Sequence, residues 1–292
     1  MNIDELSTVA VVGAGSMGRQ IALNTALHGF QVRLWDASSE QMAAARRWIE
    51  DYVAGRLEKQ RWTQQQADQA RGNLAFASSL QDACGAADLA IEAVVEDVET
   101  KRKVFGDLDE LCPARAILAT NSSTIVSSRL ADVTQRPAQV ANMHYFNPAM
   151  VMEVVEVVQG PHTSPETAAT LVEFCTRTGK RPIWMKREID GFIANRLLGA
   201  VIREAGRLVD EGYATFEEVD LAAEKALGHP MGPFRLLDMT GIDVSYLVSQ
   251  DRFNRTGREE DRPARCIEER VKAGHLGRKT GRGFYSYESR GR

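Results

Sequence analysis

The stretch TVAVVGAGSMG, residues 8–18, joins a short β-branched run to a glycine-rich turn, and an amphipathic helical pattern follows. The motif G-x-G-x-x-G between a strand and a helix is typical of a dinucleotide-binding turn. Gly13 permits the tight turn, Gly15 lets the backbone approach a pyrophosphate, and Gly18 lets helix and strand pack closely. Free N–H groups at the helix start make an anion site. The expected cofactor contacts are Gly13, Gly15, Ser16, Met17 and Gly18.

An acidic residue after the next strand supports this interpretation. Residues 31–35 predict a second short strand, and Asp36 follows it, roughly 20 residues after the first glycine, as the fingerprint requires. A carboxylate here can hydrogen-bond both ribose hydroxyls of NAD and repels the 2′-phosphate of NADP. Asp36 could instead be only the first residue of a loop. Because no arginine stands beside it, NAD is the expected cofactor.

The pattern up to about residue 185 is that of an α/β domain. Short apolar runs alternate with amphipathic segments, which predicts a doubly wound parallel sheet with ligands beyond the carboxyl ends of its strands. After that only helical patterns follow, with breaks at residues 229–233 and at Gly274. We therefore expect a Rossmann-type domain over residues 1–187, a boundary near Arg187, and a smaller all-α domain over residues 188–292.

Composition narrows the class of protein. The 292 residues are 43% hydrophobic and 26% charged, with a formal net charge of -4, which argues against nucleic acid as the main partner. The cysteines have no paired spacing that suggests zinc or a disulfide framework, so we expect free thiols and no metal. They are Cys84, Cys112, Cys175 and Cys266. The N-terminus lacks the order of a signal peptide, and no apolar run approaches a membrane span, so a cytoplasmic protein without a membrane partner is expected.

The segment 140–158 carries charges where few are expected. It contains two apolar runs separated by a turn at Asn147-Pro148, and the second run, residues 151–158, predicts a strand buried on both faces. That run nevertheless contains Glu153 and Glu156, and a buried carboxylate is costly unless it is paired. His144, at the end of the first run, is a candidate partner. A carboxylate that fixes the imidazole tautomer makes the histidine a better base. Alternatively, His144 is a satisfied core histidine and both glutamates face solvent.

Polar residues recur at one edge of the predicted sheet. Glu96, Ser123 and His144 each follow a predicted strand, at the edge where a doubly wound sheet binds its ligands. Each alone could be a helix cap. Their recurrence at a single edge is the stronger indication of a site.

Several motifs in order carry a family resemblance. With Glu156 they are GAGSMG (13–18), NSS (121–123), HYFNP (144–148), GFIANR (191–196), HPMGP (229–233) and KTGRGFY (279–285). Together they resemble the L-3-hydroxyacyl-CoA dehydrogenase family, in particular its 3-hydroxybutyryl-CoA form, over essentially the whole chain. The resemblance implies NAD-dependent, reversible oxidation of a 3-hydroxyacyl-CoA to the 3-ketoacyl-CoA.

The resemblance also implies roles for single residues. His144 matches the base that takes the hydroxyl proton, and Glu156 matches its partner. Ser123 and Asn195 match residues that hydrogen-bond the reacting oxygen. Lys59 matches a CoA-contacting lysine, whereas Tyr52 stands where some members have a CoA-contacting serine. The positions that match residues around NAD are Asp36, Glu96, Lys101, Asn147 and Lys279.

Two other functions remain open at this point. One is an NAD-dependent dehydrogenase of a non-CoA hydroxy acid or sugar acid on the same scaffold. The other is a catalytically silent NAD-binding protein, against which the intact His144, Glu156, Ser123 and Asn195 argue. A homodimer is expected, because residues 191–212 repeat apolar side chains at helical spacing and no sheet follows to cover them.

Overall fold

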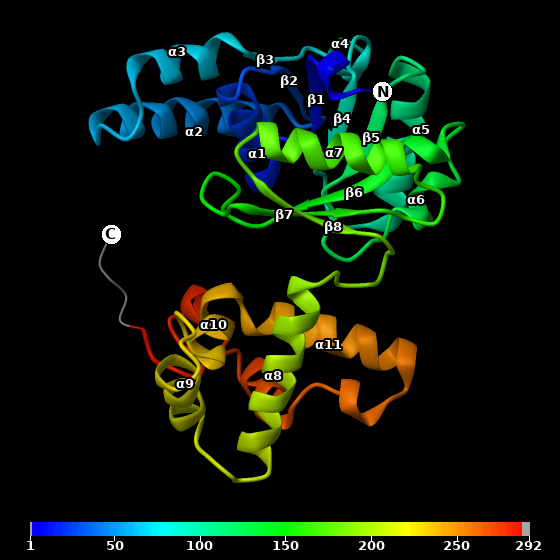
Figure 1. Ribbon diagram of the computed structural model, residues 1–292. Coiled ribbons are helices and arrows are strands. Elements are labelled where there is room, and N and C mark those ends of the chain that lie inside the picture. The colour runs from blue at the N-terminus through cyan, green and yellow to red at the C-terminus, as the bar shows by residue number, and fades with distance from the viewer. Residues whose placement is uncertain (1, 288–292) are drawn as a thin grey trace. The chain divides into compact units, whose positions relative to one another are not determined.

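The computed structural model describes residues 2–287, and the chain divides into two compact units, Met1–Phe192 and Ile193–Arg292 (Figure 1). The first unit is built on an eight-stranded sheet of order β3-β2-β1-β4-β5-β6-β7-β8. Its strands are β1 (Thr8–Val12), β2 (Gln31–Trp35), β3 (Leu74–Phe76), β4 (Leu89–Glu92), β5 (Ile117–Thr120), β6 (Val140–Tyr145), β7 (Val154–Val158) and β8 (Arg181–Met185).

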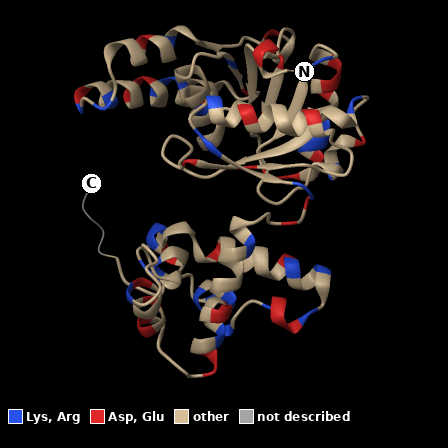
Figure 2. Ribbon diagram, in the orientation of Figure 1, with Lys and Arg blue, Asp and Glu red and all other residues tan. Residues whose placement is uncertain are grey.

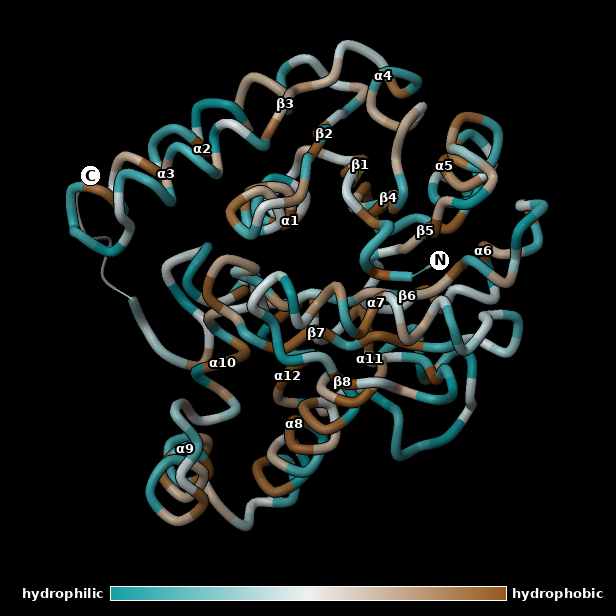
Figure 3. Tube along the Cα trace, turned by 45° about the horizontal axis from the view of Figure 1, so that its top comes forward, coloured by the Kyte–Doolittle hydropathy of each residue, from teal (hydrophilic) through white to brown (hydrophobic). Residues whose placement is uncertain are grey.

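Helices cover both faces of this sheet. One hydrophobic core joins the sheet to α1 (Ser16–Leu27), α2 (Ser39–Glu58), α3 (Gln64–Gly72) and α7 (Pro165–Arg177). A second core joins the opposite face to α4 (Leu80–Cys84), α5 (Val98–Leu111) and α6 (Ser128–Ala131). The short 3₁₀ helices of this unit are η1 (Ile3–Glu5) and η2 (Pro137–Gln139). Figure 3 shows hydrophobic residues along the central strands, which are buried on both sides as strands between two helical layers must be.

Local signals in the sequence fix several helix starts. The Ser38 hydroxyl accepts from Gln41 N, and Thr63 with Gln66 forms a reciprocal capping box. Ser164 caps α7, with Pro165 in the first position, where its missing N–H has no cost. Figure 2 shows Lys and Arg interspersed with Asp and Glu along α2. None of the helices formed by residues 2–287 combines the length and apolar character that crossing a bilayer requires.

Two element boundaries and one strand direction differ from the expectations. The strand predicted from residue 151 begins only at Val154, since Val151 and Met152 lie in an exposed turn and Val151 is 59% exposed. The sheet is mixed, because β7 runs antiparallel to β6 while β8 runs parallel to β7. The helix expected from Gly191 begins at Ala194, because Gly191 and Phe192 both have positive φ and cannot continue a right-handed helix.

The second unit is helical, as the helical sequence patterns after residue 187 predict. It contains α8 (Ala194–Asp210), α9 (Phe216–Lys225), α10 (Pro233–Thr240), α11 (Ile242–Thr256), α12 (Arg265–Lys272) and the 3₁₀ helices η3 (Glu259–Asp261) and η4 (Arg278–Thr280). Aromatic rings form its centre: Phe234 and Phe284 have ring centroids 4.5 Å apart, and Phe216 packs against both.

Two buried aspartates hold the second unit together. Asp220 accepts from Phe234 N at 2.8 Å, Arg235 N at 3.0 Å and the Tyr285 hydroxyl at 2.9 Å. Asp238 likewise accepts from the backbone N–H groups of residues 284 and 285 and from the Tyr287 hydroxyl at 3.0 Å. Residues 234 and 235, just after HPMGP, and residues 284 and 285 of KTGRGFY therefore bind buried carboxylates, which ties together segments that are far apart in the sequence.

Candidate active site at the carboxyl ends of the strands

The antiparallel register of β6 and β7 sets the central pair of the site. His144 lies directly opposite Glu156, and His144 Nδ1 is 2.9 Å from Glu156 Oε2. Cross-strand neighbours on one face of a sheet are close enough to interact directly. The histidine is 3% exposed and the glutamate 0%. The buried pair, and not the arrangement in which both glutamates face solvent, is therefore present. Glu153, by contrast, is exposed beside Arg181.

The surroundings of His144 fix the orientation of its ring. Phe146 packs edge-on at 4.6 Å between ring centroids, and Phe192 lies at 5.4 Å. Because an ionised carboxylate only accepts hydrogen bonds, the Nδ1–H tautomer donates to Glu156 and leaves Nε2 as the acceptor. Among residues 2–287 no side chain or backbone group is found hydrogen-bonded to Nε2. The geometry thus provides an oriented imidazole with a free basic nitrogen.

The glycine turn fits a dinucleotide. Gly13 has φ +106°, and a Cβ there would lie 2.5 Å from Ala93 O, while a Cβ on Gly18 would overlap Gly13 O. Nothing lies within 4 Å of a Cβ built on Gly15, so open space remains where a pyrophosphate must approach. Gly15 is the N-cap of α1 without a side-chain cap, which leaves the first-turn N–H groups of Ser16, Met17 and Gly18 available for an anion.

Asp36 follows β2 and hydrogen-bonds the glycine turn. Its Oδ2 accepts from Ala14 N and its Oδ1 from Ser38 N, each at 2.8 Å. Each carboxylate oxygen has a second lone pair, so the half-buried group can still accept from ribose hydroxyls. The turn, the helix start and the aspartate together suit NAD.

The loop after β5 places Ser123 at the same edge of the sheet. Its backbone N–H donates to Glu96 Oε1 at 3.1 Å, while no partner of its hydroxyl is found within residues 2–287. The Asn121 side chain accepts from Tyr145 N at 3.0 Å, which ties the loop to the residue after His144. Asn147 follows on the exposed turn beyond β6, and Gln20 Nε2 lies 3.4 Å from its Oδ1. The structure thus brings Glu96, Ser123 and His144 together at one edge.

Lys101 is buried inside the first unit. It is 1% exposed, and its Nζ is 2.7 Å from Glu92 Oε1 and 3.3 Å from Glu96 Oε2.

Sequence reasoning did not single out Glu92, Thr120 or Phe192. A glutamate at the end of the apolar run of β4 is the same signal that identified Glu156, so Glu92 was detectable by the same argument. Phe192 carried no such signal.

The remaining predicted positions are on helices. Lys59 is the exposed C-cap of α2, and Tyr52 stacks on Trp48 within that helix at 4.9 Å between ring centroids. Asn195 lies in the first turn of α8. Lys279, in η4, forms an ion pair with Asp243 at 2.6 Å.

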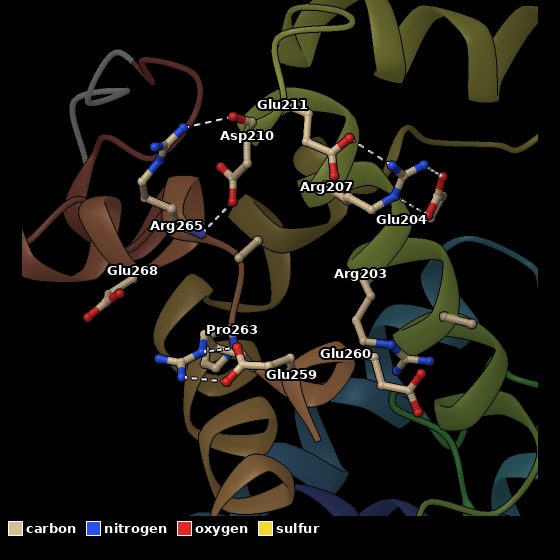
Figure 4. Close-up of a pocket in the computed structure, with 13 residues that line it drawn as sticks. Arg203, Glu204, Arg207, Asp210, Glu211, Glu259, Glu260, Pro263, Arg265 and Glu268 are labelled. Carbon is tan, nitrogen blue, oxygen red and sulfur yellow. Dashed lines mark hydrogen bonds and ion pairs between the residues drawn. The ribbon is translucent and has the colours of Figure 1, made fainter. Parts of the chain in front are cut away.

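Neither of two well-formed cavities in the described part of the chain includes His144 or Glu156. One of about 660 Å³ belongs wholly to the second unit, between α8 and the 259–268 segment (Figure 4). Most of its lining charges are paired with one another, such as Arg207 with Glu204 and Glu211, so it offers little uncompensated charge to a ligand. The other, of about 260 Å³, lies in the first unit and includes Tyr52, Arg56 and Trp62.

Comparison with known proteins identifies the family. The model of the 3-hydroxyacyl-CoA dehydrogenase NAD binding domain matches residues 8–189, and that of the 3-hydroxyacyl-CoA dehydrogenase C-terminal domain matches residues 191–287. A probable 3-hydroxybutyryl-CoA dehydrogenase of Bacillus subtilis is 36% identical over 286 residues, covering 98% of this chain and 99% of that protein.

Solved structures agree with this. The (S)-3-hydroxybutyryl-CoA dehydrogenase of Ralstonia eutropha is 34% identical with a TM-score of 0.92, covering 97% of this chain and 100% of that one. A diketoreductase described as acting on dicarbonyl compounds is 34% identical with a TM-score of 0.85, covering 97% and 99%. The α/β fold class and NAD as cofactor are thereby confirmed, and the chain belongs to the 3-hydroxyacyl-CoA dehydrogenase family of NAD-dependent oxidoreductases.

Proposed function

We propose that this protein reversibly oxidises the 3-hydroxyl of an L-3-hydroxyacyl-CoA, with 3-hydroxybutyryl-CoA as the substrate, to the 3-ketoacyl-CoA. The single observation that carries the proposal is the buried His144–Glu156 pair at 2.9 Å, on the sheet edge that also holds the dinucleotide turn. A base oriented by a carboxylate is what removal of an alcohol proton requires.

In this mechanism His144 Nε2 takes the hydroxyl proton while C3 loses hydride. NAD+, when bound on the Gly13–Gly18 turn with its ribose at Asp36, is the acceptor of that hydride. Glu156 stabilises the imidazolium that forms, a charge that exists only as the reaction proceeds and therefore favours the transition state. In the reverse direction the imidazolium returns the proton to the carbonyl oxygen, by microscopic reversibility.

Other residues orient the reactants. The Ser123 hydroxyl has no hydrogen-bond partner within residues 2–287, so it is suited to donate to the reacting oxygen. Asn195 is assigned the same task by its motif. Glu96, Asn147 and Lys279 are assigned to the surroundings of NAD. Lys101 was expected there too; its burial among acids suits an indirect role better.

The CoA moiety is the least supported part of the substrate. Lys59 is exposed and cationic, which suits a phosphate, and the 260 Å³ cavity of the first unit includes Arg56 and Trp62 in its lining. The similarity to a diketoreductase favours, as a second candidate, reduction of dicarbonyl compounds without CoA.

Oxidation of NADH in the presence of acetoacetyl-CoA tests the proposal directly. We expect saturable turnover with acetoacetyl-CoA and far weaker turnover with free acetoacetate at the same concentration. Equal kcat/KM for the two substrates would favour the second candidate. Absence of turnover with either, despite NADH binding, would favour a silent binding protein.

The proposal includes a homodimer formed through the second unit. Apolar side chains on α8 and α11 are exposed, among them Leu197 at 64% and Leu247 at 63%. Burying such a patch against a second copy removes apolar surface from water. Light scattering at micromolar concentration should give twice the mass of one 32.3 kDa chain, and the mass of a single chain would contradict the dimer. The four buried free thiols suit a cytoplasmic location, which localisation in cells would test.

A further inference from the structure

Lys101 is one of the few charged side chains that are almost fully buried, with 1% of its surface exposed. A lysine is rarely buried, because removing an ammonium from water is costly unless acceptors replace the water. Its Nζ donates hydrogen bonds to Glu92 Oε1 at 2.7 Å and Val94 O at 3.4 Å, and it forms an ion pair with Glu96 Oε2 at 3.3 Å. An ammonium donates at most three hydrogen bonds, so these partners satisfy it without a ligand.

Glu96 connects this lysine to the loop that carries Ser123. While Oε2 faces Lys101, Oε1 accepts from Ser123 N at 3.1 Å, Thr124 N at 3.0 Å, the Thr124 hydroxyl at 2.8 Å and the Ser122 hydroxyl. Burial raises the pKa of Glu96, but hydrogen bonds from Ser122 and Thr124 and the charge of Lys101 lower it overall. The carboxylate is therefore ionised, and one of its oxygens binds three consecutive residues of the loop.

Glu92 makes a second connection to the same loop. Its Oε2 accepts from the Thr120 hydroxyl at 2.7 Å, and that hydroxyl oxygen accepts from Ser122 N at 3.1 Å. Its Oε1 accepts from Val94 N at 2.7 Å as well as from Lys101. Removing the lysine would leave a fully buried carboxylate without its counter-charge, which is strongly destabilising.

The loop is also bound from the side of β6. Asn142 accepts from Ser127 N at 2.7 Å and donates to Ile125 O at 2.9 Å. With Asn121 held to Tyr145 N, the loop is fixed between the acids of β4 and the strand of His144. Within this fixed loop the Ser123 hydroxyl is left free of hydrogen bonds to residues 2–287.

We infer that Lys101 is a positioning residue for Ser123: through Glu96 and Glu92 it holds the 122–124 loop so that the Ser123 hydroxyl points at the reacting oxygen. In this inference Lys101 acts through the two glutamates and not through a contact of its own with substrate or cofactor. The inference rests on the proposed function, in which Ser123 binds that oxygen. A misplacement of about 1 Å in such a group lowers turnover on the order of 10²-fold.

The main test variant is the double substitution Glu92→Gln with Lys101→Met. It removes both fully buried charges together, and a glutamine at 92 still has an oxygen for Val94 N. Glu96 also loses its counter-charge, but its side chain is 40% exposed. Lys103→Met is the matched control, because Lys103 is on the same helix but its side chain is 79% exposed and pairs with Asp107 four positions on.

Four measurements separate positioning from general damage: thermal stability, hydrogen exchange of amides 122–125, the Kd for NADH, and kcat with acetoacetyl-CoA in Ser123 and Ser123→Ala backgrounds. We expect faster exchange of those amides and a Kd for NADH within about threefold of the unmodified protein. We expect kcat to fall about 10- to 100-fold with Ser123 present, but only about twofold once Ser123 is alanine, because residues acting as a unit are not additive. The control variant should leave all four nearly unchanged.

Two results would overturn the inference. A tenfold weaker Kd for NADH with unchanged exchange of amides 122–125 would make Lys101 a determinant of cofactor binding. An equal loss of kcat in both backgrounds would make its role merely structural.

If the double variant does not fold, Glu96→Ala tests the inference instead. The Glu96 side chain is 40% exposed, and after its removal Lys101 and Glu92 still pair with each other. It should show the same dependence on Ser123, and Glu96→Gln, which keeps an acceptor for the loop, should recover most of the lost kcat. If the unmodified protein does not turn over acetoacetyl-CoA, the proposed function fails. The exchange of amides 122–125 then still shows whether Lys101 holds the loop.

Discussion

Buried acids in the two units are used differently. In the second unit, Asp220 and Asp238 each accept two backbone N–H groups and a tyrosine hydroxyl, and all these donors belong to the fold. In the first unit, Glu156 holds a histidine whose second nitrogen has no hydrogen bond within residues 2–287. Glu96 holds a loop whose serine hydroxyl is equally free.

The difference shows that burial of a charge does not by itself indicate catalysis. Buried polar groups are satisfied almost everywhere in proteins, because an unpaired one is costly. What distinguishes the first unit is a neighbouring group that keeps free hydrogen-bonding capacity while the acid is satisfied. Substitutions in the two units should therefore have separable effects.

Removing the base should have the largest effect on chemistry. His144→Ala is expected to lower turnover of acetoacetyl-CoA by about 10²–10⁴-fold, the usual contribution of a general base. NADH binding, followed by fluorescence titration, should stay nearly intact because the dinucleotide turn is separate from the pair. Turnover within a few-fold of the unmodified protein would contradict the assignment of His144.

Neutralising Glu156, the partner of His144, should have the second-largest effect on turnover. Glu156→Gln keeps the size of the side chain but removes the charge that stabilises the imidazolium, so we expect kcat to fall on the order of 10²-fold. Glu153→Gln, on the exposed turn before β7, is the control and should change kcat little. If both variants behaved alike in steady-state kinetics, the carboxylate opposite His144 would have no special role.

The second unit should respond through stability alone. Asp220→Ala leaves three donors without an acceptor, which costs about 3 kcal/mol in the free energy of unfolding. Chemical denaturation should show this loss, whereas kcat per folded molecule at a permissive temperature should hardly change. A large fall in kcat with an unchanged free energy of unfolding would show that this acid acts in catalysis.

Asp36 shares features with the buried acids of both units. Like Asp220 it accepts backbone N–H groups, but its oxygens keep lone pairs that can bind a ligand. Asp36→Ala should lower the preference for NADH over NADPH by about tenfold, because repulsion of the 2′-phosphate disappears. The ratio of kcat/KM for the two cofactors measures it. Equal use of both by the unmodified protein would show that Asp36 does not discriminate.

Local patterns in the sequence predicted most of the fold. Strand and helix positions, the caps at Thr63 and Ser164 and the dinucleotide turn all depend on residues close together in the chain. The pairing of His144 with Glu156 was predicted as one of two alternatives, because a buried acid needs a partner. The antiparallel direction of β7 was not predicted, since alternating apolar runs indicate strands but not their direction.

Contacts that depend on how the elements pack were also beyond the sequence. The burial of Lys101 could not be predicted, because its three partners come together only when β4 and α5 pack. Phe192 was missed for the same reason. Nothing in its neighbours along the chain shows that it lies against the ring of His144.

Phe192 combines an unusual backbone conformation with a contact to the ring of His144. It is the last residue of the first unit, it is fully buried, and its φ of +46° is rare for a residue with a side chain. The chain thus leaves the first unit through a backbone conformation that only surrounding contacts can maintain, and one of those contacts is the ring of His144. The packing that maintains this unusual backbone conformation is therefore the same packing that orients the imidazole of His144.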